Sequence, residues 1–66
     1  MTNYKPTGSL VSGDGYGAAI LKGDDATYAV RLSLAGRPMT VSPIASFRAA
    51  SDLVDDFCAI ARRESR

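Results

Sequence analysis

The side chains that enzymes use most often for catalysis are nearly absent from this chain. Its 66 residues include no histidine and one cysteine, Cys58. Histidine is the commonest general base, the usual partner of a nucleophilic serine or cysteine, and the commonest zinc ligand. A single cysteine cannot form a zinc–thiolate site, and no cation stands beside Cys58 to activate its thiol. We therefore predict that the chain is not an enzyme and uses no metal or cofactor, and that Cys58 lies at the edge of the core.

Two other patterns have the composition of ligand sites but lack the required spacing. The segment Ser12–Gly17 is rich in glycine, as phosphate-binding loops are, but it precedes a predicted strand and no Lys-Ser or Lys-Thr pair follows it. Asp24 and Asp25 are adjacent, whereas a calcium loop needs oxygen ligands at alternating positions and paired catalytic carboxylates face each other across a cleft. We interpret the glycine segment as a flexible turn and the two aspartates as turn formers.

The composition argues against several classes of function and indicates a cellular compartment. Eight Lys and Arg against seven Asp and Glu give a net charge of +1, which provides no strong field for nucleic acid or anionic lipid. A lone cysteine excludes an internal disulfide, and no apolar run approaches the roughly 20 residues of a membrane span. The segment Met1–Pro6 lacks the apolar stretch of a signal peptide. These features favour a soluble, cytoplasmic domain that does not bind membranes.

The pattern of apolar residues predicts three strands. Residues 1–15 are rich in Gly, Ser, Thr and Pro, so we expect a mobile N-terminal arm, with at most a short strand around residues 9–12. Strands are expected at residues 16–22 and 26–34, and the second alternates with period two. A third strand, 39–41, ends near Pro43, as an edge strand would. The connecting turns are predicted at 22–25 and 35–38.

A helix follows these strands. Apolar residues recur at helical spacing through residues 50–61, and either Ser51 or, one turn earlier, Ser46 is expected to cap the helix. Aspartates in its N-terminal half and arginines at its C-terminal end would complement the helix dipole. We therefore predict one α+β domain over residues 16–66, a three-stranded antiparallel meander with one C-terminal helix packed on it (βββα). Its expected core residues are Ile20, Tyr28, Val30, Leu32, Leu34, Val41, Phe47, Leu53, Val54, Phe57 and Ile60.

The meander over residues 16–41, followed by the segment Phe47–Phe57, resembles in size and layout the small phage-encoded inhibitor proteins, anti-CRISPR proteins among them. That resemblance implies stoichiometric binding to a host protein complex that handles nucleic acid, without catalysis or a cofactor. A rigid helix that displays carboxylates can also imitate nucleic-acid phosphates in a basic groove. The candidate contact residues lie in the turns and on the polar helix positions: Asp24, Asp25, Arg37, Asp52, Asp55, Asp56, Arg62 and Arg63.

An alternative function follows from the order of the elements. Three strands and a helix, entered through Phe47–Ser51, resemble AP2-type DNA-binding domains, including the arm-binding domains of some integrases. In that family the sheet enters the major groove and arginine reads guanine. The residues that would serve here are Lys22, Arg31, Arg37 and Arg48. The sequence departs from the family because the outer face of its central strand carries one Arg among Thr, Ala and Ser. DNA binding of this kind would depend on salt and be detectable at about 50 mM.

A third hypothesis is self-association. The strand predicted at 39–41 is an edge strand, and exposed edges can pair with a symmetry mate. A homodimer through Met39–Val41 is therefore compatible with either function.

Overall fold

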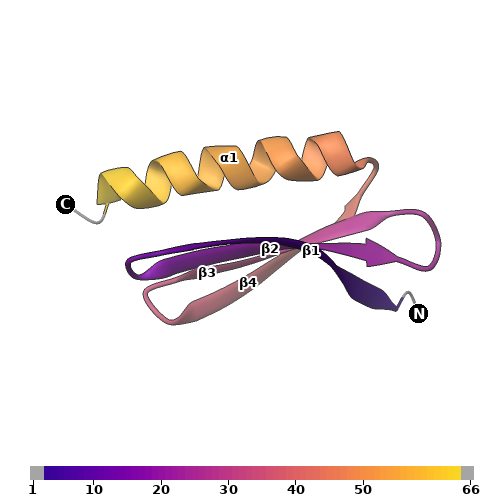
Figure 1. Cartoon of the computed structure of the whole chain (residues 1–66), viewed down its shortest axis with the longest axis horizontal. Helices are drawn as coiled ribbons and strands as arrows, with labels where there is room; N and C mark the ends of the chain where they lie inside the picture. Colours follow the sequence, from indigo (N-terminus) through magenta and orange to yellow (C-terminus); the bar gives the residue numbers. More distant parts are fainter. Residues whose placement is uncertain (1–2, 65–66) are drawn as a thin grey trace.

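The computed structural model describes residues 3–64 and contains four strands followed by one helix (Figure 1). Residues 1–2 of the predicted arm and residues 65–66 of the predicted domain lie outside the described residues. The elements are β1 (Tyr4–Gly13), β2 (Tyr16–Gly23), β3 (Tyr28–Leu34), β4 (Arg37–Ile44) and α1 (Phe47–Glu64). The strands form one antiparallel sheet in the order β1-β2-β3-β4. The α+β class and the C-terminal helix are confirmed, but the sheet has four strands instead of the predicted three.

The additional strand is β1, which occupies most of the segment predicted to be an arm. It pairs with β2, so that Leu10 lies opposite Ala19 and Val11 opposite Ala18. Most β1 side chains are exposed. An edge strand whose faces are mostly uncovered needs few apolar residues, which is why its Gly, Ser and Thr content concealed it from pattern analysis.

A bulge divides β1 into two parts. The register with β2 shifts between Pro6 and Leu10, and Gly8 adopts a φ of 90°. The Thr7 hydroxyl donates a 2.8 Å hydrogen bond to the Ile20 carbonyl. This side-chain bond takes the place of the backbone bond that the bulge interrupts.

Tight turns fix the register of the other strands. Between β2 and β3, Asp25 Oδ1 accepts hydrogen bonds from the Thr27 amide (3.2 Å) and the Thr27 hydroxyl (2.6 Å), which confirms its role as a turn former. Between β3 and β4, Ala35 and Gly36 have φ values of 52° and 80°. Two consecutive positive φ values are typical of the type I′ turn, whose twist suits a two-residue hairpin.

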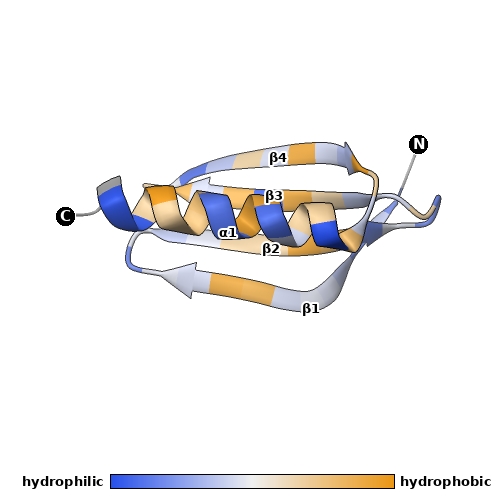
Figure 2. Cartoon of the chain, turned by 90° about the horizontal axis from the view of Figure 1, so that it is seen from above, coloured by the Kyte–Doolittle hydropathy of each residue, from blue (hydrophilic) through white to orange (hydrophobic). Residues whose placement is uncertain are grey.

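The core lies between α1 and the two central strands. Figure 2 shows the helix running above β2 and β3, with β1 and β4 on either side of it. Two aromatic pairs stand edge to face along this layer, Tyr28 with Phe47 and Tyr16 with Phe57, at centroid distances of 5.8 and 6.4 Å. The buried core cluster comprises Ala18, Ile20, Val30, Leu32, Ile44, Ala50, Val54 and Cys58.

Several predicted core residues are instead exposed. Ile20, Val30, Leu32 and Val54 are buried as expected, and Tyr28, Leu53 and Phe57 are partly buried. The prediction was wrong for four residues, whose side chains are 37–56% exposed: Leu34, Val41, Phe47 and Ile60. For Val41 on β4 and Ile60 on the flank of α1 the reason is geometric, because a helix about 10 Å wide covers about two strands spaced about 4.8 Å apart. Leu34 and Phe47 are the end residues of β3 and α1.

The helix begins at the earlier of its two candidate caps. The Ser46 Oγ accepts a 3.1 Å hydrogen bond from the Ala49 amide, and the helix starts at Phe47. Its first turn therefore contains no acidic residue, and the aspartates lie farther along. The prediction that they complement the N-terminal dipole was wrong, whereas Arg62 and Arg63 do lie in the last turn.

The cap gives a testable difference between two serines of the same helix. Ser46→Ala removes an oxygen that satisfies a first-turn amide, so we expect the free energy of unfolding to fall by about 1 kcal/mol. Ser51→Ala, inside the helix, should leave it nearly unchanged. Urea denaturation followed by circular dichroism measures both, and equal effects of the two substitutions would contradict the assigned cap.

Candidate interaction surface

The charged residues predicted to contact a partner do not form one surface. Asp24 and Asp25 lie in the turn between β2 and β3, while Arg37 begins β4 at the opposite end of the sheet. The remaining candidates are on the helix. A partner would have to span the molecule to contact all three places, so at most a part of the predicted set can act together.

A hydrogen bond between Arg62 and β2 shows which flank of the helix each charged residue lies on. Arg62 Nε donates a 3.4 Å hydrogen bond to the Tyr16 hydroxyl on β2. This bond is the main reason that the pKa of Arg62 lies above its usual value. Since successive helical residues turn by about 100°, Asp55 lies on the same flank as Arg62, whereas Asp52 and Asp56 are rotated toward the other flank. All three aspartates are exposed.

The opposite flank of the helix borders an uncovered apolar surface. Ile60 precedes Arg62 by two positions, so it points roughly away from Tyr16 and toward β4. The pairing of Met39 with Leu32 and of Val41 with Val30 places both β4 side chains on the helix side of the sheet. Met39 is 55% exposed and Ile60 56% exposed. Leu34, the last residue of β3, lies on the same face of the sheet as Leu32 and Val30 and is also exposed. We call this surface the β4–α1 shelf, and it consists of Leu34, Met39, Val41 and Ile60.

The two sheet edges differ in their free backbone groups. The two-residue turn at Ala35–Gly36 makes Leu34 and Arg37 a hydrogen-bonded pair, so the backbone groups of Pro38 and Thr40 point outward from β4. Pro38 has no amide hydrogen. Because its backbone points away from β3, the sheet loses no hydrogen bond, but the outer edge of β4 lacks one backbone donor. On β1, the pairing of Gly13 with Tyr16 directs both backbone groups of Leu10 and of Ser12 outward.

The basic residues of the DNA-binding alternative are also dispersed. The side chains of Arg31 and of its partners Ala19 and Thr40 lie on the helix-free face of the sheet. Lys22 pairs with Tyr28 and lies on the helix side. Arg37 begins β4 and Arg48 lies in the first turn of α1. The structure therefore does not gather Lys22, Arg31, Arg37 and Arg48 on one face.

The helix-free face is hollowed beside Arg31. One shallow hollow of about 180 Å³ is lined by β1, β2 and β3, including Ser12, Gly17 and Ser33. A second of about 360 Å³ lies along β1 and β2 near Leu10 and Leu21. Both hollows are lined mainly by apolar and small residues, so they suit an apolar side chain better than a charged ligand.

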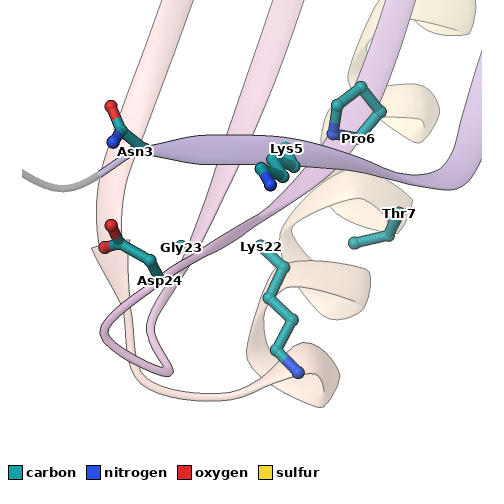
Figure 3. Close-up of a pocket in the computed structure, with 7 residues that line it drawn as sticks. All are labelled: Asn3, Lys5, Pro6, Thr7, Lys22, Gly23 and Asp24. Atoms are coloured by element: carbon teal, nitrogen blue, oxygen red, sulfur yellow. The ribbon is translucent and has the colours of Figure 1, made fainter.

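A larger hollow of about 410 Å³ lies near the N-terminal end of β1 (Figure 3). Lys5 and Lys22 are opposite each other in the sheet and both are exposed. The Asp24 amide donates a 3.1 Å hydrogen bond to the Asn3 carbonyl, and the Thr7 hydroxyl is bound to Ile20. In Figure 3 the two lysine side chains extend in different directions, so the hollow lacks a converging set of donors.

Within residues 3–64, no three His, Cys, Asp or Glu side chains gather where they could hold a metal ion. In the same part of the chain, no helix is both long and apolar enough to cross a membrane. Comparison of the chain with protein-family models, with curated proteins and with solved structures finds no match.

The sequence reasoning missed the apolar residues at the outer strands. Leu10 is 73% exposed and Val11 38% exposed on β1, and Met39 is exposed on β4. The available signal was the isolated pair Leu10-Val11 within a polar segment, and the edge-strand prediction already made for Met39. Neither signal shows from sequence alone on which side of the sheet the helix would lie.

Cys58 is buried within the core cluster, deeper than the position at the core edge that the sequence predicted. We expect its thiol to react slowly with a disulfide reagent in the folded protein, because reaction must await local opening. Ala59→Cys in a Cys58→Ala background places a thiol on the exposed neighbouring position and should react fast. Spectrophotometric thiol titration compares the two rates, and equal rates would contradict the burial of Cys58.

Proposed function

We propose that this chain is a non-enzymatic protein-binding module that occupies a partner complex stoichiometrically. The observation that carries the proposal is the β4–α1 shelf, where apolar side chains from the helix and from the strands beside it remain exposed. Exposed apolar patches with a polar border are typical of protein-binding surfaces. The shelf supplies the apolar centre of such a contact.

The border of the shelf indicates what the partner should carry. On α1, the flank next to Ile60 continues into Asp56 and Asp52, with Arg63 between them in rotation. On β4, Arg37 stands opposite Leu34 of the shelf. All four charged residues are exposed. The apolar centre is complementary to apolar side chains on a partner, and the two carboxylates in its border are complementary to basic groups there. Asp55 lies farther around the helix, on the flank of Arg62, so it belongs to a different part of the surface.

A host complex that handles nucleic acid would meet this description, because its grooves are basic. This is the partner class that the resemblance in size and layout to small phage-encoded inhibitors implies. In the proposed function, the carboxylates of α1 approach basic groups that otherwise bind phosphate, while the shelf anchors the contact. No step of this function requires a reaction at a side chain.

The proposal predicts that partner capture depends on one flank of the helix. The tagged protein is used to capture binding partners from an extract of the cells in which it occurs, and the extract is either treated with nuclease or left untreated. We expect a discrete protein complex to survive nuclease with the wild-type chain. Ile60→Asp should abolish its capture, since a charge would replace an apolar contact. Asp56→Arg should weaken it, because like charges would then face each other.

Asp55→Arg is the matched control, since it makes the same charge change on the same helix away from the shelf, and it should retain the complex. Circular dichroism checks that every variant folds. If Ile60→Asp and Asp56→Arg capture the complex as well as the wild type, the shelf is the wrong surface. If only nucleic acid is retained and all protein is lost after nuclease, the DNA-binding alternative replaces the proposal.

A further inference from the structure

The part of β1 that follows its bulge lacks the proline and charged side chains that usually prevent edge strands from pairing, whereas Lys5, Pro6 and the bulge itself lie in the first part of the strand. Such edges are commonly protected by proline or by charged side chains. The stretch Thr7–Gly13 contains neither. By contrast, β4 begins with Arg37 and includes Pro38 and Pro43. An extended strand that adds to this sheet therefore meets fewer obstacles at β1 than at β4.

We propose that two copies of this chain associate through β1, antiparallel about a two-fold axis at Val11. The result is a continuous sheet made of the four strands of each copy. This assembly goes beyond the proposed function, because the β4–α1 shelf lies at the far edge of each sheet and stays accessible. It also moves the expected homodimer contact from Met39–Val41 to the opposite edge.

The direction of the free backbone groups fixes the register. Leu10 and Ser12 each present an amide and a carbonyl outward, and they lie at equal distances from Val11. Leu10 can therefore exchange two hydrogen bonds with Ser12 of the partner subunit, and the two-fold axis repeats this pair. Val11 then faces Val11 of the partner subunit in a close, non-hydrogen-bonded position.

The side chains are complementary in the same register. On the helix-free face, Ser12 is followed across the sheet by Gly17 and Ser33, which line the hollow of about 180 Å³. Leu10 of the partner subunit would lie opposite Ser12, at the mouth of this hollow. Leu10 is the most exposed large apolar residue described, at 73%. Leu10 of the same chain also lines this hollow. Association thus brings the exposed Leu10 side chains of both copies to the hollows that Leu10 itself lines.

The helix side of the junction is also apolar. Val11 lies on the same face as Ala18, which is buried in the core. Contact between the two Val11 side chains would extend this apolar row across the axis, and Val11 is 38% exposed in the single chain. The charged residue next to the junction, Asp14, falls opposite Gly8 of the partner subunit, so the register sets no like charges against each other.

The first test measures mass in solution as a function of protein concentration by sedimentation. We expect the wild-type chain to shift from monomer toward dimer, and Leu10→Lys to remain monomeric because a charge replaces the apolar contact. Thr40→Lys is the matched control, since Thr40 lies in the same row as Leu10 at the opposite edge of the sheet. The Thr40→Lys variant should dimerise as the wild type does.

The second test identifies the edge by oxidation in a Cys58→Ala background. Val11→Cys should form a disulfide-linked dimer rapidly, because paired Cα atoms about 4.5 Å apart suit a disulfide. Met39→Cys, on the other edge, should not. A monomer at every concentration, or a dimer that crosslinks through Met39→Cys and not through Val11→Cys, would overturn the proposal. The proposal would also be overturned if the wild-type chain stays monomeric but captures another protein, and Leu10→Lys loses that capture. The β1 edge would then bind a different protein and not a second copy of this chain.

Discussion

The width of one helix is the constraint on which the rest of this structure depends. A single α-helix, about 10 Å across, can cover about two strands at their usual spacing of about 4.8 Å. In this chain α1 covers β2 and β3, and the core forms there between Ile20, Val30, Leu32 and Val54 (Figure 2). A four-stranded sheet with one helix must therefore leave the helix-side residues of its outer strands incompletely covered.

The uncovered residues differ between the two sides. On β4, Met39 and Val41 join Ile60 of α1 in a shelf that combines strand and helix side chains. On β1, Val11 on the helix side and Leu10 on the helix-free face lie after the bulge, in a part of the edge that contains no proline or charged residue. These two sites are on opposite edges of the sheet. A partner protein on the β4–α1 shelf and a second copy on β1 would thus be compatible in one assembly.

Sequence patterns predicted the central elements well, because their residues report directly on burial. The alternation around Val30 predicted β3, and the helical spacing around Val54 predicted α1, with Ser46 already a candidate cap. The patterns failed at the periphery. β1 has few apolar residues because it is an edge, and Ile60 fits the apolar stripe although its place on the helix points it past the sheet. Both errors concern tertiary position, which local periodicity does not encode.

The candidate site could be predicted from sequence only in part. Exposed charges such as Asp56 were identified because charge is visible in the sequence. The apolar partners of that charge were assigned to the core, since pattern analysis places Val41 and Ile60 inside by default. Their exposure depends on how far the helix reaches across the sheet, and this is known only once α1 is placed over β2 and β3.

Residue-resolved amide hydrogen exchange at low and high protein concentration tests most directly whether the helix secures the centre and leaves the β1 edge open. At low concentration, we expect the Leu32 amide to exchange slowly and the outward amides of Leu10, Ser12 and Thr40 to exchange fast. At high concentration, Leu10 and Ser12 should become slow while Thr40 stays fast. Slow exchange of Leu10 and Ser12 at every concentration, or protection of Thr40 in their place, would contradict the account.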